Sequence, residues 1–224
     1  MVKYSKRKFI YKSCSLCLGA FAFSQISYAK KKDTIIKFEG DVLLNGKKIQ
    51  TDLAVKYNDK IETKSASQAI VSLDDDIFQI RENTIFELPS KNESKSGGKL
   101  LAGAILASFT PGKPKSLQVE NKGTIGIRGT GIYLEVEKEQ TQFCLCYGKA
   151  EIFSKNNKLI TETDTKFHKD FLILNDGTIK PTEPLERKLN HTSRQNIDLE
   201  NFAGRPSPFI GSFRDIISNF QSPI

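Results

Sequence analysis

Residues that commonly build catalytic or metal sites are scarce in this sequence. It has two histidines, His168 and His191, and four cysteines, of which only Cys144 and Cys146 lie beyond the first 17 residues. The Gly-x-Ser-x-Gly motif of serine hydrolases and the His-Glu-x-x-His motif of zinc proteases are both missing. These absences predict a protein without enzymatic activity.

Acidic residues are missing from the first 29 positions, which hold five of the 34 basic residues. The rest of the chain therefore carries 29 basic against 26 acidic residues, an ordinary balance for a solvated surface. It also lacks the interleaved basic and aromatic residues that track phosphates and stack on bases. We predict no nucleic-acid partner.

A hydrophobic run long enough to cross a bilayer, about 20 residues, is also missing. Ser13 to Tyr28 is shorter and diluted by polar residues, follows a basic segment, and ends with the small residues Ser27 and Ala29. This pattern predicts a cleavable signal peptide over residues 1–29, with cleavage between Ala29 and Lys30. We therefore expect a periplasmic protein with no membrane span after cleavage.

Two export routes fit this leader. The run Ser5-Lys6-Arg7-Lys8-Phe9-Ile10 resembles a twin-arginine signal in which Lys6 stands at the place of the first arginine. Any basic leader sometimes supplies a Lys-Arg pair, so ordinary secretion fits equally well. The leader leaves both routes open.

From Thr34 the chain reads as short segments of alternating hydrophobic residues broken by turn signals such as Asn45-Gly46. The polar run Lys91 to Lys99 predicts a loop, and the apolar run Leu100 to Phe109 predicts a buried strand. We predict an all-β domain over residues 34–180, of the sandwich, roll or barrel type.

The composition changes near Pro181, and residues 181–224 are predicted to form a C-terminal extension. One helix fits within Asn190 to Gly204, with Ile197, Leu199 and Phe202 on its apolar side. A proline-rich tail follows the helix. The extension is therefore predicted to be partly helical.

Glycines are densest between Gly123 and Gly131, but β-branched residues alternate with them and a strand follows at Ile132. A phosphate-binding loop needs its glycines at the start of a helix, so this cluster does not predict one. Glycines within a sheet permit bulges and close backbone approach instead.

The same segment resembles the FecR-domain family, whose Arg-Gly-Thr signature is matched by Arg128, Gly129 and Thr130. The stretch Asn58-Asp59-Lys60-Ile61-Glu62-Thr63 is similar to a second family motif. The resemblance implies a periplasmic β-rich domain that binds or senses an envelope protein or small ligand. Arg128 itself either pairs with a carboxylate such as Glu135 or Glu137, or faces an anionic ligand.

Cys144 and Cys146 are predicted to share one face of a strand, with Phe143, Leu145 and Tyr147 on the other. Residues two apart on a regular strand are separated by about 6.6 Å, which disfavours a disulfide between them. Two cysteines with two histidines form a common zinc set, and thiolates also suit copper(I).

Three interpretations of the set Cys144, Cys146, His168 and His191 stay open: a zinc or copper site, a redox-active disulfide, or packing cysteines with exposed histidines. The Cys-x-Cys-Tyr-Gly run and the closing Gly204-Arg205-Pro206-Ser207-Pro208-Phe209 are similar to FecR-like sequences, which implies a tail that folds back on the β domain. The leading hypothesis is a non-enzymatic binding, sensing or scaffold domain, and the alternative is a metal or redox protein.

Overall fold

The computed structural model describes residues 33–51, 53–120, 122–182 and 190–209. The predicted signal peptide, its cleavage site between Ala29 and Lys30, and the end of the proline-rich tail lie outside the described residues. Within the described residues, no helix has the length and apolar character that a membrane span requires.

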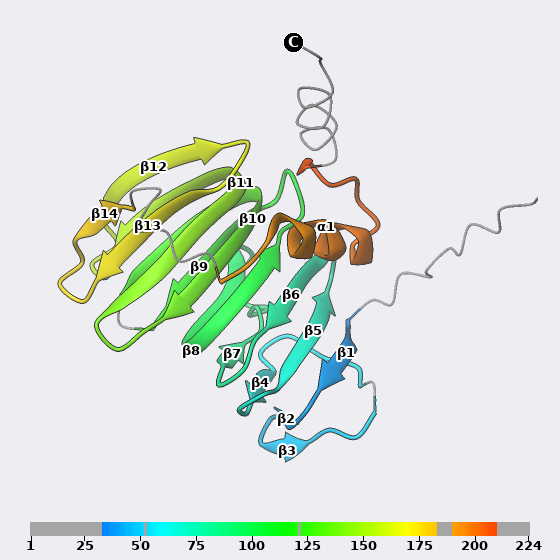
Figure 1. Cartoon of the computed structure of the whole chain (residues 1–224). Helices are drawn as coiled ribbons and strands as arrows, with labels where there is room; N and C mark the ends of the chain where they lie inside the picture. Colours follow the sequence, from blue (N-terminus) through cyan, green and yellow to red (C-terminus); the bar gives the residue numbers. More distant parts are fainter. Residues whose placement is uncertain (1–32, 52, 121, 183–189, 210–224) are drawn as a thin grey trace, which may run out of the picture.

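The described residues are mostly β, and the helix that they contain in full follows the last described strand (Figure 1), which confirms the predicted fold class. The strands are β1 Thr34–Glu39, β2 Val42–Leu44, β3 Lys47–Lys48, β4 Lys60–Thr63, β5 Gln68–Leu73, β6 Asp76–Ile80, β7 Ile85–Glu87, β8 Ser96–Ser108, β9 Pro114–Val119, β10 Gly123–Val136, β11 Gln140–Ser154, β12 Leu159–Thr165, β13 Lys169–Leu174 and β14 Ile179–Pro181. The helix α1 is Ser193–Phe202.

All these strands belong to one mixed 14-stranded sheet, whose main path is β14-β13-β11-β10-β9-β8-β7-β4-β2-β3. Its long strands change partners along their length: β11 pairs first with β13 and then with β12, and β8 pairs with β7 and then with β6. Strands that change partners in this way bend a sheet. The bend gives the molecule an inner and an outer face (Figure 1).

Side chains alternate between these two faces. On β8, Ile105 and Ala107 join a large inner core, whereas Ala104 and Leu106 join a smaller outer cluster. The inner core draws on strands from β1 to β13, and its members include Ile35, Val71, Phe78, Phe86, Leu100, Phe109, Leu117, Ile132, Leu134, Phe143 and Leu145. The outer cluster consists of Ile77, Ala104, Leu106, Tyr133, Cys144, Cys146, Tyr147, Leu199, Ala203 and Phe209.

Helix α1 covers the outer face, where it contacts β6 and β8 (Figure 1). It begins after Thr192, whose hydroxyl accepts a hydrogen bond from the backbone of Gln195 in a capping box. Leu199 is buried, and Ile197 and Phe202 pack against the outer cluster. The predicted helix and its apolar side are confirmed.

Two features of the strands differ from the sequence prediction. The segment 91–99 is not a loop throughout, because β8 already begins at Ser96. The strand predicted to follow the glycine cluster at Ile132 already begins at Gly123, so the cluster lies within the single strand β10, whose register with β11 shifts twice between Arg128 and Ile132. Gly129, at a φ of +63°, supplies the backbone conformation that such an irregularity needs.

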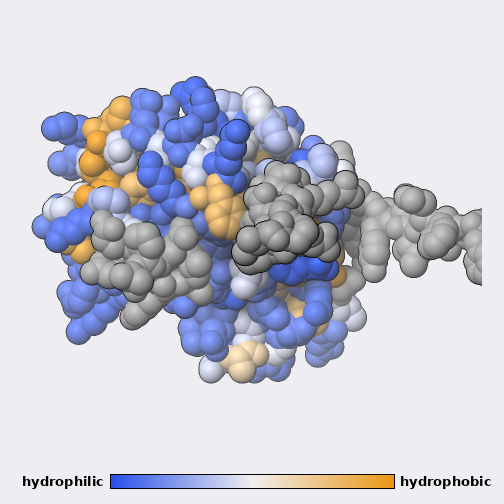
Figure 2. Space-filling view, turned by 45° about the horizontal axis from the view of Figure 1, so that its top comes forward, coloured by the Kyte–Doolittle hydropathy of each residue, from blue (hydrophilic) through white to orange (hydrophobic). Residues whose placement is uncertain are grey.

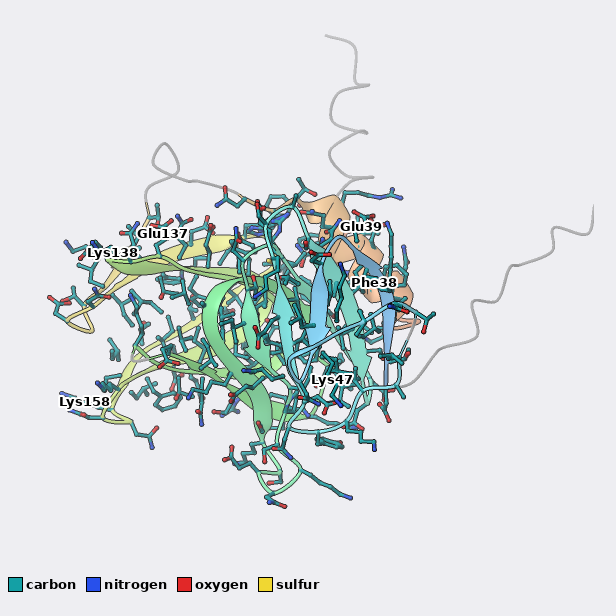
Figure 3. All side chains as sticks on the ribbon, turned by 90° about the horizontal axis from the view of Figure 1, so that it is seen from below. Phe38, Glu39, Lys47, Glu137, Lys138 and Lys158 are labelled. Carbon is teal, nitrogen blue, oxygen red and sulfur yellow. The ribbon has the colours of Figure 1, made fainter. Side chains whose placement is uncertain are left out.

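The surface is largely hydrophilic in the view of Figure 2, with apolar residues in small separate areas. The exposed large hydrophobic residues among those described are Leu53, Leu159, Ile160 and Phe167. Figure 3 shows that the turns carrying Lys138 and Lys158 lie at the opposite end of the molecule from Phe38 on β1. Charged residues therefore cover the ends of the long strands.

Candidate metal centre

A β-bulge places the two cysteines. On β11, Leu145 pairs with Ile132 of β10 and Tyr147 pairs with Gly131, so Cys146 is the extra residue between two paired positions. A bulge turns the side chains that follow it relative to those before it. The Sγ atoms of Cys144 and Cys146 lie 3.9 Å apart, and both residues are buried free thiols.

The bulge also corrects the predicted distribution of side chains on β11. Regular alternation places Tyr147 on the face of Phe143 and Leu145, and this prediction is wrong. Tyr147 lies in the outer cluster beside the two cysteines, whereas Phe143 and Leu145 lie in the inner core. The extra residue shifts every later side chain on the strand to the opposite face.

His168 reaches the cysteines from the turn between β12 and β13. Its backbone N–H donates to the carbonyl of Cys146 at 3.0 Å, which fixes the turn against β11. Its ring atom Nδ1 lies 3.3 Å from the Sγ of Cys144, and Nε2 lies 3.0 Å from the hydroxyl of Ser193. The ring also stacks on Phe209, with 5.4 Å between centroids.

His191 reaches the same point from the residue before the helix cap. Its Nε2 lies 3.3 Å from the Sγ of Cys146 and 3.3 Å from the Nδ1 of His168. Its ring stacks on Tyr133 at 4.5 Å between centroids, and only 3% of the residue is exposed. The predicted alternative of exposed histidines is therefore wrong for His191.

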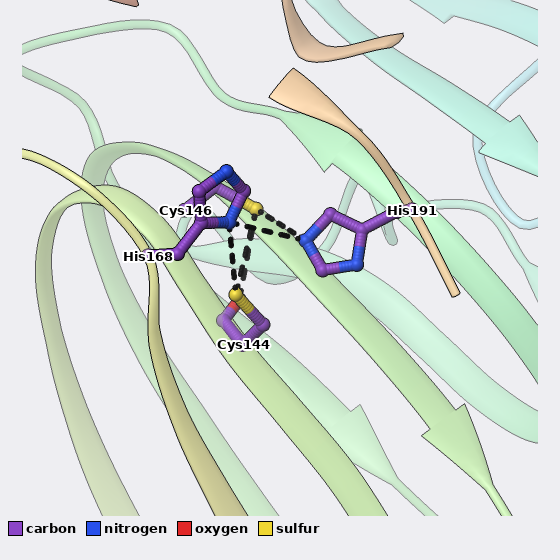
Figure 4. A group of neighbouring side chains, drawn as sticks. All are labelled: Cys144, Cys146, His168 and His191. Atoms are coloured by element: carbon purple, nitrogen blue, oxygen red, sulfur yellow. Dashed lines mark hydrogen bonds between the residues drawn. The ribbon is translucent and has the colours of Figure 1, made fainter. Parts of the chain in front are cut away.

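Figure 4 shows the two sulfur atoms and the two imidazole rings turned toward one another, and the four candidate ligand atoms all lie within 4.8 Å of one another. A tetrahedral zinc ion has bonds of about 2.0–2.1 Å to nitrogen and about 2.3 Å to sulfur, which separates neighbouring ligand atoms by about 3.3–3.8 Å. Four of the six distances between these atoms, from 3.3 to 3.9 Å, lie close to this spacing.

The two thiols differ in acidity. Burial raises the pKa of the Cys144 thiol, and its contact with Cys146 raises it further. Burial also raises the pKa of Cys146, but hydrogen bonds with Cys144, His168 and His191 outweigh burial and hold that pKa well below its usual range. The lowered pKa favours the thiolate form of Cys146, which is the form that binds a metal ion.

A buried polar cluster holds the end of the C-terminal segment close to this site. The carboxylate of Glu200 pairs with the Nε of Arg205 at 2.7 Å and accepts hydrogen bonds from Ser108 and Tyr147. Arg205 also donates to the backbone carbonyl of Asp75. Together with the burial of Phe209, this cluster shows that the tail packs against the sheet as far as Phe209, the last described residue.

The Arg-Gly-Thr signature does not join the metal cluster. Arg128 is exposed and pairs with a carboxylate, as predicted, but the partner is Glu151 at 2.9 Å and not Glu135 or Glu137. Gly129 passes so close to Pro111 that a Cβ would lie 2.6 Å from the Cα of that residue, and Thr130 is fully buried. These residues occupy structural positions in β10.

Next to the signature, Gly131 lies beneath the C-terminal segment. A Cβ at Gly131 would lie 2.3 Å from the ring of Tyr147 and 2.9 Å from the side chain of Asn196 on α1. This glycine therefore permits the close packing of α1 on the sheet. Sequence reasoning treated it as part of a bulge and missed this contact.

No family model matches the sequence, and no curated protein matches it. Two solved structures from Parabacteroides distasonis ATCC 8503, each described as a "putative anti-sigma factor", resemble part of the fold. One has 15% identity and a TM-score of 0.47, with 55% of this chain and 59% of that chain covered. The other has 16% identity and a TM-score of 0.48, with 64% and 73% covered. The first match spans less than two thirds of that chain, and the likeness is one of fold alone.

Proposed function

We propose that the chain is a non-enzymatic domain of the bacterial envelope that binds one soft metal ion through Cys144, Cys146, His168 and His191. The observation that supports this proposal most directly is the spacing of the four ligand atoms, all within 4.8 Å of one another and three of them contributed by buried residues. Two sulfur and two nitrogen atoms at this spacing can share one ion, which would replace the contacts that they otherwise make with one another.

The ligand set restricts the choice of ion. Two thiolates and two imidazoles form a common tetrahedral set for zinc(II), and soft thiolates also suit copper(I). Calcium and magnesium prefer oxygen ligands, which this cluster does not supply. We therefore propose zinc(II) or copper(I) as the bound ion.

The completeness of the ligand set favours a structural or sensing role over catalysis. Catalytic zinc sites keep one position open for water or substrate, whereas four protein ligands fill a tetrahedral ion. The hydroxyl of Ser193, 3.0 Å from the Nε2 of His168, orients that ring from behind, as partners of metal-bound histidines commonly do.

A bound ion would join three separate parts of the chain. The cysteines belong to β11, His168 to the turn before β13, and His191 to the segment that enters α1. The ion would therefore fasten the C-terminal segment to the outer face of the sheet. A domain fastened in this way changes shape with its metal content, which suits a binding, sensing or scaffold function.

The envelope location rests on the sequence. The predicted signal peptide over residues 1–29 and the resemblance to FecR domains both favour a periplasmic protein whose partner is an envelope protein or small ligand. The segment Arg128 to Thr130 carries that resemblance. Fractionation of cells that produce the chain, followed by N-terminal sequencing of the periplasmic product, tests this part of the proposal.

The metal proposal is tested by elemental analysis of the full chain purified without chelators, and by titration of the metal-free protein with cobalt(II). We expect one ion per chain, together with the intense thiolate-to-cobalt absorption of a tetrahedral site. Cys144→Ser and His191→Ala should both abolish stoichiometric binding. Cys17→Ser, the same kind of change in the predicted signal peptide, should leave it intact.

Circular dichroism separates loss of the site from loss of the fold, since the inner core contains none of the four ligands. A chain that folds normally but binds neither zinc(II) nor copper(I) stoichiometrically would refute the proposal. Unchanged metal content in the folded Cys144→Ser protein would also refute it, because the ion would then lie elsewhere.

A further inference from the structure

The two cysteines differ in their access to solvent. Cys144 lines a small cleft of about 90 Å³ together with Gln142, Asp170 and His191. Cys146 is fully buried and does not line this cleft. A water molecule occupies about 30 Å³ in the liquid, so the cleft has room for a reactant the size of hydrogen peroxide.

The same two sulfur atoms lie within reach of each other. A disulfide needs its sulfur atoms at about 2.05 Å, and they stand 3.9 Å apart here. Rotation about the Cα–Cβ bonds moves each Sγ by more than the difference requires. The regular strand assumed in the sequence prediction disfavours a disulfide between these cysteines. The bulge at Cys146 makes the strand irregular at this point, so that objection no longer applies.

We infer that Cys144 and Cys146 form an oxidation site for a small peroxide, and that closure of their disulfide releases the bound ion. The second part of this inference rests on the proposed function. Cys144 reacts first because it borders the cleft, and Cys146 resolves the product because it is the neighbouring sulfur.

The reaction balances with hydrogen peroxide as the oxidant. The sulfur of Cys144 gives up its proton as it attacks one peroxide oxygen, the O–O bond breaks, and the leaving hydroxide takes that proton and departs as water, so that the sulfur becomes a sulfenic acid. The thiolate of Cys146 then attacks that sulfur, the S–O bond breaks, and hydroxide leaves as the disulfide forms. The two sulfur atoms have together lost two electrons, and one peroxide has gained them.

Oxidation removes half of the ligand set. Two imidazoles alone hold zinc(II) or copper(I) far more weakly than two imidazoles with two thiolates, so the ion leaves. His191 then loses its link to β11 through the ion, while Glu200 and Arg205 still hold the C-terminal end of α1. The expected product is a metal-free domain whose tail is loosened at one end.

The test treats the zinc-loaded full chain with one equivalent of hydrogen peroxide and follows zinc release with a chromogenic chelator. Tryptic peptides are then weighed, since residues 139–149 form one peptide that contains both cysteines of the site. We expect zinc release in step with the loss of two hydrogens from that peptide. A thiol reductant followed by zinc should restore the starting material.

Two variants separate the steps. In Cys146→Ser the resolving sulfur is missing, so a sulfenic acid should persist on Cys144 and react with dimedone. In Cys144→Ser the cysteine that lines the cleft is missing, so oxidation of Cys146 should slow by about tenfold or more, as expected for a sulfur without solvent access. Neither result depends on bound metal, because thiol oxidation is also measurable in the metal-free chain.

The outcomes distinguish this inference from the proposed function. Binding of one ion, with both thiols intact after treatment with peroxide in excess, would overturn the oxidation site and leave the metal site standing. Oxidation of the peptide to sulfinic acid without a disulfide would overturn it as well. A chain that binds no ion but forms the disulfide would refute the proposed function and retain the oxidation site.

Discussion

The two faces of the bent sheet use the same strands in different ways. The inner core consists of aliphatic and aromatic side chains contributed by strands from β1 to β13. The outer face buries two thiols, the imidazole of His191 and the ion pair between Glu200 and Arg205 beneath one short helix. Apolar burial stabilises the first face directly, whereas the second is stable only while its polar groups find partners.

We infer from this difference that the inner face maintains the fold and the outer face carries the function. The inner core needs no ligand, so it holds the long strands β8, β10 and β11 in place whatever happens on the outer face. The outer cluster can then respond to a metal ion or an oxidant without unfolding the domain. Substitutions on each face, and removal of the ion, test how independent the two faces are.

The largest expected effect belongs to the inner face. Phe78 is fully buried and lies 5.2 Å from Phe86 and 5.6 Å from Phe109 between ring centroids. Phe78→Ala removes these contacts and leaves a cavity, which should lower the free energy of unfolding by about 3–5 kcal/mol. Urea denaturation followed by circular dichroism measures this loss.

The comparison predicts that the penalty of Phe78→Ala is the same in zinc and in chelator, because distant sites contribute additively within about 0.5 kcal/mol. Ile77, the neighbouring residue on β6, belongs to the outer cluster, so Ile77→Ala is the matched control on the other face of the same strand. A penalty at Phe78 that shifts by about 2 kcal/mol or more on chelation would contradict the independence of the two faces.

Removal of the ion is expected to have the next largest effect. At a free zinc concentration one hundred times the dissociation constant, binding stabilises the folded state by about 2.7 kcal/mol, and a chelator removes this contribution. Amide hydrogen exchange should then rise in α1, whose entry segment carries His191, and stay low in the strands around Phe78. Uniform acceleration over the whole chain would contradict this prediction.

Much of the fold could be predicted from the sequence because side chains that point to the inner core recur at every second position of the strands. Ile105 and Ala107 on one side of β8, with Ala104 and Leu106 on the other, give the two-residue period of a strand buried on both faces. The lengths of β10 and β11 could not be predicted, because bulges near Gly129 and Cys146 interrupt the alternation while hydrogen-bonded pairing continues.

The candidate site could be predicted only as a set of residues. Two cysteines and two histidines suggest a ligand set by chemistry alone, but 22 residues separate Cys146 from His168 and 23 separate His168 from His191, so nothing local brings them together. A turn fixed by the backbone of Cys146 brings in His168, and the packing of α1 brings in His191. Ser193 carries no motif at all and was missed.

The smallest expected effect concerns Ser193, whose only described role toward the site is its 3.0 Å contact with the Nε2 of His168. Ser193→Ala keeps the helix cap at Thr192 and removes the group that orients the ring. Metal affinity should fall by about tenfold, the lower end of the effect of such partners. Competition with a chromogenic chelator measures the change.

The effect of Ser193→Ala must appear in metal affinity and not in the stability of the metal-free protein. Ser72→Ala, at a buried serine of β5 whose hydroxyl has no hydrogen-bond partner among the described residues, is the matched control and should leave affinity unchanged. If Ser193→Ala instead weakens the metal-free fold and leaves affinity unchanged, the hydroxyl supports α1 and not the ion. The outer face would then be stabilised by helix packing more than by its metal. In that case both faces would depend mainly on packing, and they would differ less than we propose.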